Sequence, residues 1–493
     1  MAKLTPCTLT VAVVGLGLLW SVPGNAVADD LATLKSELEA LKSDYNSRVQ
    51  ALEQRIKALE SAANAPAAAQ APAPASASAP TAAAAAATPA APPAFESPPP
   101  PALPAPPGKS GNATAFNPAI SVIITGNYND LSRDPATYRI AGFIPPPEGE
   151  GPGDRSFNLG ESELTLSANV DPYFFANVTA AIQSDNSIDI EEAYFKTLAL
   201  NHGFTLKGGR FFSGTGYLNE VHSHNWDFVD QPLVYQAFFA GQLAQDGVQL
   251  RWLAPTDYFI ELGAEAGNGH SFPGTQRDSN ALGSTALFAH AGGDVGDSTS
   301  WRFGVSWLQA HSSDRAYQDT DQFGTAVTNA FSGTTRTWIV DGTLKWAPHG
   351  DPTHHQLKVQ GEYMHRTENG QLAFDVTGAD LADAYSSSQS GWYLQAVYEF
   401  IQRWRAGVRY DSMNSGTPSI GLVEAQVLPA SAFPALLPGT PQRTSIMVDW
   451  SLSEFSRLRA QYAWDEARAA HELDHQLFLQ YIFAIGAHGA HKF

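Results

Sequence analysis

The segment Trp301–Trp307 reads WRFGVSW, and every second residue in it is a large apolar one. The positions between them hold Arg302, Gly304 and Ser306. Successive side chains of a β-strand point to opposite faces, so this alternation predicts a strand with one apolar face and one polar face. A strand that exposes two tryptophans opposite an arginine is typical of a barrel wall that meets lipid outside and water inside.

The same period of two recurs from Phe116 to the C-terminus and predicts an all-β fold, a transmembrane antiparallel β-barrel of about sixteen strands. The expected strands are 118–128, 157–168, 172–183, 190–198, 202–211, 246–254, 257–265, 283–292, 299–309, 335–346, 354–365, 389–400, 402–412, 441–451, 455–465 and 475–485. A soluble β-sandwich would also alternate, but it would not place aromatic residues opposite Arg and Glu on so many strands.

The connections between these strands alternate between short and long. Short turns on one side and long loops on the other are typical of outer-membrane barrels. The expected long loops are 129–156, 212–245, 310–334, 366–388 and 413–440. Aromatic residues near strand ends suit the two membrane interfaces. They are Tyr128, Trp252, Tyr258, Trp338, Trp346, Trp392, Trp450 and Trp464.

Residues 1–28 are typical of a signal peptide, with an apolar stretch at Leu9–Trp20 and a small-residue cleavage site at Ala26–Ala28. Cys7 is the only cysteine of the chain and lies inside this segment. The mature chain would therefore have neither disulfides nor a catalytic thiol.

Residues 29–61 carry apolar residues at spacings of three and four, which predicts a periplasmic coiled-coil helix. These residues are Leu31, Leu34, Leu38, Leu41, Tyr45, Val49, Leu52, Ile56 and Leu59. A single helix packed on a domain would show the same stripe, but nothing adjacent in sequence could cover it. Residues 62–115 are rich in Ala and Pro and predict an extended linker. Residues 116–493 would form the barrel.

The formal net charge of the 493-residue chain is −20. An acidic chain argues against nucleic acid as a partner, because binding phosphates needs clustered Lys and Arg. The sequence contains no G-x-S-x-G, H-E-x-x-H or Walker motif. We therefore expect no enzymatic activity and no required cofactor.

One connection is too long for a hairpin turn and too aromatic for a slack linker. It begins GRFFSGTGYLNEVHSHNWDFVDQPLVYQAFFAGQ at Gly209, and it has no Lys or Arg between Arg210 and Arg251. We expect it to fold into the lumen and form a pore constriction with its Glu220, His222, His224, Asp227 and Asp230. Alternation assigns a set of arginines to the lumen face of later strands, across the pore from this loop. They are Arg403, Arg405, Arg409, Arg457 and Arg459.

An acidic loop facing a basic wall would create a transverse field that separates cations from anions. The alternative is that the arginines pair with wall acids such as Asp411 and Asp449 and only hold the wall together. The acidic loop and the net charge favour cations.

Two groups of histidines suggest a metal site, because imidazole and carboxylate suit Zn²⁺. One group is His222, His224 and Asp227, and the other is His471 and His475. A His-x-His pair is more often a surface or packing pair than a ligand set. Zn²⁺ would be a ligand or a cargo of the protein.

The order of these parts resembles bacterial outer-membrane porins of the phosphate- and carbohydrate-porin type, from the coiled coil to the terminal Phe493. That resemblance implies a homotrimer in the outer membrane of a Gram-negative bacterium, with lipid around it and small ions or solutes inside. The stretches GRFFSGTGYLNEVHSHNWDFVDQPLVY and GVQLRWLAPTDYFIELGAE and the tail GAHGAHKF look like the group called zinc-regulated outer-membrane receptors.

Together these patterns predict a porin that passes small hydrophilic solutes by passive diffusion, with a preference for cations and a role in zinc entry. One rival is an energised, TonB-linked receptor for zinc or a metal chelate, which would need a plug domain and a 22-stranded barrel. The other rival is a structural outer-membrane tether with a closed lumen.

Overall fold

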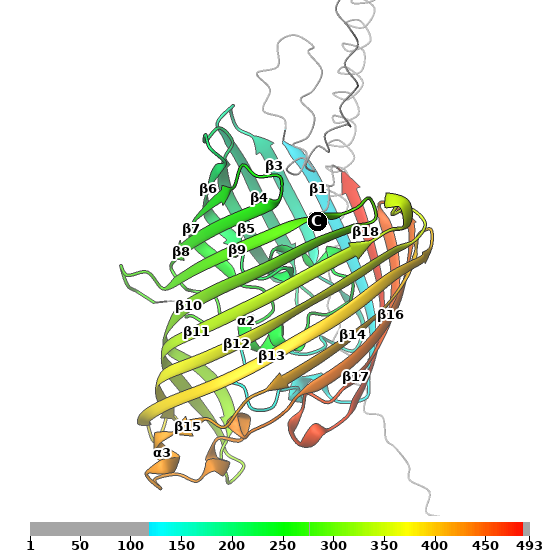
Figure 1. Ribbon diagram of the computed structural model, residues 1–493. Coiled ribbons are helices and arrows are strands. Elements are labelled where there is room, and N and C mark those ends of the chain that lie inside the picture. Colours follow the sequence, from blue (N-terminus) through cyan, green and yellow to red (C-terminus); the bar gives the residue numbers. More distant parts are fainter. Residues whose placement is uncertain (1–117, 276, 487–493) are drawn as a thin grey trace, which may run out of the picture. The chain divides into compact units, whose positions relative to one another are not determined.

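The computed structural model describes residues 118–275 and 277–486 (Figure 1). The predicted signal peptide 1–28, coiled coil 29–61, linker 62–115 and terminal Phe493 lie outside these residues. No helix in the described part of the chain has the length and apolarity to span a membrane.

The strands join edge to edge in one antiparallel sheet that closes on itself, because the last strand pairs with the first from Ser121↔Gly486 to Leu131↔Gln476. A closed barrel leaves no strand edge unpaired, which a membrane requires of any β-structure. The strands of the first half are β1 Ala119–Leu131, β2 Ser156–Leu159, β3 Ser162–Asn169, β4 Phe174–Ile182, β5 Ile188–Thr197, β6 Phe204–Phe212, β7 Ala244–Leu253, β8 Phe259–Gly267 and β9 Ser284–Val295. Those of the second half are β10 Thr299–Thr320, β11 Ala326–Trp346, β12 Gln356–Phe374, β13 Leu381–Ile401, β14 Trp404–Asn414, β15 Ser419–Ile420, β16 Gln442–Ser453, β17 Ser456–Asp465 and β18 Asp474–Gly486.

These eighteen strands make a wall of sixteen. Both β2 and β3 pair with β1, at different heights, so they are two parts of one wall strand. The two-residue β15 pairs with β13 beyond the end of β14 and extends that strand in the same way. The predicted sixteen-strand antiparallel barrel is therefore confirmed, and each expected strand overlaps an observed one.

The two faces of the wall differ as the alternation predicts. On β10, Phe303 and Val305 are exposed on the outside, whereas Gly304 and Ser306 are buried on the inside. At the ends of β14 and β16 the rings of Trp404 and Trp450 stack on the outer face with centroids 5.5 Å apart. The outer belt of apolar side chains makes this a transmembrane barrel.

The prediction of long loops is wrong at two places. Residues 310–334 and 366–388 are mostly strand, and only the turns 321–325 and 375–380 separate β10 from β11 and β12 from β13. The outward-facing residues of these strand extensions are mostly small or polar, as at Gln318 and Thr320, so apolar and polar residues do not alternate there with the period seen in the rest of the wall. Their backbones still pair, since ladder hydrogen bonds need no apolar side chain.

The interior of the barrel contains an apolar core of its own. The helix α2 Leu233–Phe239 has all seven side chains buried, and it lies inside the barrel against β13 and β14 (Figure 1). Inward-facing apolar residues of the wall, such as Leu308, Ile339 and Met364, pack in the same cluster. Tyr138 and Phe143 of the loop between β1 and β2 complete it.

A second apolar cluster lies among the extensions of β10–β13 and the loop between β14 and β16. That loop contains α3 Gly421–Glu424 and reaches the far ends of the long strands (Figure 1). Short 3₁₀ turns complete the described elements. They are η1 Pro135–Thr137, η2 Leu218–Glu220, η3 Ser223–Asn225, η4 Pro348–Gly350, η5 Ala430–Ala432, η6 Pro434–Leu436 and η7 Ala469–His471.

Candidate functional site

The connection between β6 and β7, residues 213–243, folds into the lumen, and we call it the lumen loop. Its first residues donate backbone hydrogen bonds to polar side chains of the wall strands β8, β10 and β12. Gly214 donates to Glu265 of β8 over 2.8 Å, and Leu218 donates to Glu362 of β12 over 2.9 Å. Glu362 also accepts hydrogen bonds from the hydroxyls of Tyr235 and Tyr393. A fully buried carboxylate with several donors holds the loop at a defined depth.

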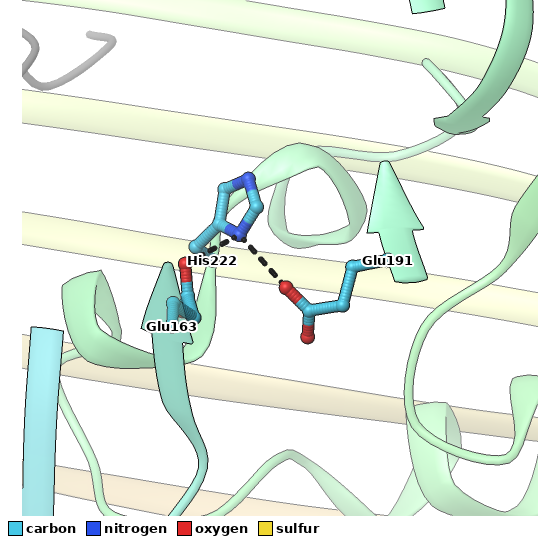
Figure 2. A group of neighbouring side chains, drawn as sticks. All are labelled: Glu163, Glu191 and His222. Atoms are coloured by element: carbon cyan, nitrogen blue, oxygen red, sulfur yellow. Dashed lines mark ion pairs between the residues drawn. The ribbon is translucent and has the colours of Figure 1, made fainter. Parts of the chain in front are cut away.

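The middle of the lumen loop brings two histidines against glutamates of the wall. His222 Nδ1 lies 3.2 Å from Glu163 Oε2 and 3.4 Å from Glu191 Oε2 (Figure 2). Its Nε2 lies 3.3 Å from Glu192 Oε2. The neighbouring His224 contacts Glu163 over 2.7 Å, and the two imidazole rings stack with centroids 5.8 Å apart. We call this group the histidine anchor.

Burial of His222 opposes its charged form, but the three glutamates outweigh burial and hold the pKa of His222 well above its usual range. Glu163 comes from β3, and Glu191 and Glu192 come from β5. In the pairing of β4 with β5, Thr179 faces Glu192 and Ala180 faces Ile190. Glu191 is therefore the extra residue of a β-bulge, which allows two consecutive glutamates to reach the lumen loop.

Further along the loop, two aspartates meet the basic side of the wall. Asp227 forms ion pairs of 3.0 Å with both Lys358 and Arg405. Asp230 pairs with Arg409 over 2.7 Å and with Arg443 over 2.8 Å. We call these contacts the aspartate anchor. Burial would raise both carboxyl pKa values, but the facing cations outweigh it and lower the pKa of Asp227 and of Asp230.

At these aspartates the acidic loop does not face the basic wall across open space, because the aspartates contact the arginines directly. The alternative pairing also occurs. Arg405 bonds to Asp449 over 3.0 Å, and Arg409 bonds to Asp411 over 3.0 Å. Charges this buried need partners within contact distance, and the long arginine side chains reach the loop.

The remaining predicted arginines divide between wall and rim. Arg459 is buried and donates to the carbonyl of Trp226 over 2.7 Å. Arg457 lies beside Arg405 and Arg459, and its Nε and Nη1 have no hydrogen-bond partner among the described residues. Arg403 sits in the exposed turn between β13 and β14 at the edge of the barrel, with φ of 71°. It belongs to the rim of the barrel, where it lines a cavity together with Arg405 and Arg457.

The predicted metal ligands do not form one site. Asp227 is held by Lys358 and Arg405 on β12 and β14, away from the strands that His222 contacts. His471 is exposed, 4.0 Å from Glu466, and His475 contacts the hydroxyl of Tyr462. Of the predicted ligands, only His222 and His224 lie together.

Glu220 lies beside the histidine anchor and pairs with Arg251 of β7. Sequence reasoning found this loop residue but missed the wall residues that the loop meets. Missed residues are Glu161, Glu163, Glu191, Glu192, Lys358, Glu362 and Arg443. The available signal was an acidic residue at a lumen-facing position, as for Glu163, whose neighbour Leu164 is exposed to the outside.

A cavity of about 360 Å³ lies next to the lumen loop. His224 and Asn225 line it from the loop, and Arg405, Arg457 and several serines line it from the wall. Its lining is both polar and apolar, and it places these arginines beside open space next to the loop.

No model of a known protein family matches the chain. An uncharacterized protein of Aquifex aeolicus is 30% identical over 409 residues, which cover 77% of this chain and 80% of that protein.

Solved structures with a similar fold include three bacterial outer-membrane proteins, each aligned over 75% of this chain. OmpT of Vibrio cholerae, with its loop L8 deleted, is 10% identical over 99% of its own chain, with a TM-score of 0.46. The outer-membrane channel DcaP of Acinetobacter baumannii is 12% identical over 97%, with a TM-score of 0.44. An anion-selective porin from Comamonas acidovorans is 9% identical over 99%, also with 0.44. The resemblance to zinc-regulated receptors stays a prediction.

Proposed function

The chain belongs to the same family as the uncharacterized Aquifex aeolicus protein, and we propose that it is a porin of a Gram-negative outer membrane. It would admit small hydrophilic solutes by passive diffusion. The observation that carries this proposal is the lumen loop, which lies inside a closed barrel and binds oppositely charged sides of its wall through the histidine and aspartate anchors. Charged groups at a narrowing are how such pores select solutes.

The distribution of charge supports a preference for cations. At the histidine anchor, three carboxyl groups, those of Glu163, Glu191 and Glu192, surround the imidazole of His222. At the aspartate anchor, the aspartates of the loop and of the wall form ion pairs with arginines, so negative and positive charges offset each other there. The excess of negative charge therefore lies along β3 and β5, and we propose that cations pass there.

Zn²⁺ is a small cation, and it therefore belongs to the class of solutes that this path would admit. We propose that Zn²⁺ is a cargo or a ligand of the pore and that no cofactor is required. The self-association expected from the sequence, a homotrimer in the lipid of the outer membrane, is part of the same proposal. Native mass spectrometry of the detergent-solubilised protein measures the number of chains.

One observation favours a second function, a structural barrel with a closed lumen. The apolar cluster around α2 fills part of the interior, and Leu233 to Phe239 are all buried there. The energised receptor is disfavoured, because such transporters have 22 strands around a plug and this wall has sixteen.

Single-channel recording of the purified protein in a planar bilayer tests the proposal. In a KCl gradient, we expect open steps and a zero-current potential with the sign of a cation-selective pore. Open steps with an anion-selective potential would reject the cation path but keep the porin. The absence of any conductance in a folded, inserted barrel would reject the porin and favour the closed barrel.

A further inference from the structure

Three groups of the histidine anchor converge on one point. Glu163, Glu191 and His222 each offer one ligand atom, and these atoms all lie within 4.8 Å of one another. Figure 2 shows the ring nitrogen of His222 directed at both carboxylates, which come from different strands of the wall. The lumen loop therefore supplies one group and the barrel supplies two.

The distances within this group differ from those of ordinary charge-assisted hydrogen bonds, which are about 2.7–2.9 Å. His224 reaches Glu163 at 2.7 Å, within that range. His222 Nδ1 is farther away, at 3.2 Å from Glu163 and 3.4 Å from Glu191. A single N–H cannot be well aligned with two acceptors at once, and Nδ1 of His222 and Oε2 of Glu191 are buried without a hydrogen-bond partner.

Two of the three spacings within this group match those of a tetrahedral zinc site. With metal–ligand bonds of about 2.0–2.1 Å, neighbouring ligand atoms of a tetrahedron lie roughly 3.3–3.4 Å apart. The two distances from His222 Nδ1 fall close to this value. The side chain of Glu191 is 9% exposed and that of Glu163 is 2% exposed, so water competes poorly for either group.

The negative charge of these carboxylates also favours a bound cation. Burying several carboxylates close together is costly unless positive charge offsets them. A divalent ion supplies two positive charges. The β-bulge that turns Glu191 inward is a local irregularity of the wall, and bulges of this kind often re-aim a side chain at a functional site.

We propose that Glu163, Glu191 and His222 form a binding site for a divalent cation of the zinc class, with the fourth position open to water or solute. This inference deepens the proposed porin function, since the site lies on the cation path. Mixed imidazole and carboxylate ligands favour Zn²⁺ over Mg²⁺ or Ca²⁺, which prefer oxygen ligands alone. Because His222 belongs to the loop, a bound ion would also tie the loop to β3 and β5.

Titration of ZnCl₂ into the full-length protein in detergent, followed by calorimetry, tests the site without any need for conductance. We expect saturable binding that Glu191→Gln weakens roughly tenfold or more, as loss of groups around a metal does. His471→Gln is the matched control, since it removes an exposed histidine near a carboxylate, and it should bind as the unaltered protein does. MgCl₂ at equal concentration should not compete. Equal zinc affinity in Glu191→Gln and the unaltered protein would overturn the proposal.

X-ray absorption at the zinc edge gives a second test that needs no variant. We expect nitrogen and oxygen neighbours at about 2.0–2.2 Å with one imidazole. Two or more imidazoles per zinc would assign the ion to other histidines and overturn the site. A protein that binds zinc in this way but conducts no ions would keep the site and reject the porin. One that conducts but binds no zinc would do the reverse.

Discussion

The histidine anchor and the aspartate anchor hold the same loop to two parts of the wall by different means. At the aspartate anchor, Asp230 receives two guanidinium groups at 2.7 and 2.8 Å, and both arginines are 1% exposed. At the histidine anchor, His222 meets carboxylates at 3.2–3.4 Å and is 20% exposed. Short, buried and balanced contacts hold a fixed structure. Longer contacts with excess negative charge leave room for an ion.

The largest expected effect comes from breaking the aspartate anchor. Asp230→Asn would remove one buried ion pair from Arg409 and one from Arg443, and the two arginines would have to share their remaining acidic partners in the wall. Removing one partner of such a buried pair costs about 3–5 kcal/mol. Urea unfolding of the barrel in lipid or detergent would measure the loss in the free energy of unfolding.

The matched control for Asp230→Asn is Asp246→Asn. Asp246 pairs with Arg210 over 2.7 Å, but the two side chains are 32% and 35% exposed. An exposed pair contributes about 0–1 kcal/mol, so this variant should unfold almost as the unaltered protein does. Equal losses in the two variants would contradict the distinction between a buried anchor and a surface pair.

A smaller effect, on selectivity and not on stability, is expected at the histidine anchor. The double variant Glu163→Gln, Glu191→Gln removes negative charge from the proposed cation path. Its zero-current potential in a KCl gradient should move toward zero, by an amount that shrinks at high salt because of screening.

The matched control for this double variant is Asp297→Asn, which removes an acid from an exposed turn at the edge of the barrel. Its potential should stay at the unaltered value. An unchanged potential in the double variant would place the cation path elsewhere in the lumen.

Alternation along the sequence predicts the wall well, because lipid outside and water inside impose it on every membrane-spanning strand. It fails where that constraint ends, as in the extensions of β10 and β13, whose outward-facing residues are mostly small or polar. It also predicts Glu191 poorly. Strict alternation would turn one of Glu191 and Glu192 outward, and only the bulge opposite Thr179 turns both inward.

The residues that the lumen loop contributes to the site could be predicted from the sequence, but the wall residues that they contact could not. The choice of Asp227 and His222 as joint metal ligands used their closeness in the chain. In the structure the chain between them passes from one side of the wall to another, so the two side chains meet different strands. Contacts between residues more than a hundred positions apart, such as Asp227 with Lys358, depend on the register of the whole barrel.

The smallest expected effect concerns pH and the loop between β1 and β2, which packs against the apolar core near the aspartate anchor. Burial raises the pKa of Glu150 from 4.5 to about 7, although the N–H of Ile140 donates to its carboxylate over 2.7 Å. The folded loop therefore binds more protons than the unfolded loop between these two values. Its stability is fully present below about pH 4.5 and is lost as pH rises through about 7.

Limited proteolysis of this loop at pH 5 and pH 8 measures that change. The next residue, Gly151, donates a hydrogen bond to Gln236 of α2 over 3.0 Å. Ionisation of Glu150 at pH 8 should therefore weaken the packing of this loop against α2 and expose the loop to the protease. Glu150→Gln cannot ionise and should be cleaved at the same rate at both pH values. Asp230→Asn should keep the pH dependence and raise both rates, because it weakens the loop that carries α2. If Glu150→Gln kept the full pH dependence, another group would control the docking of this loop.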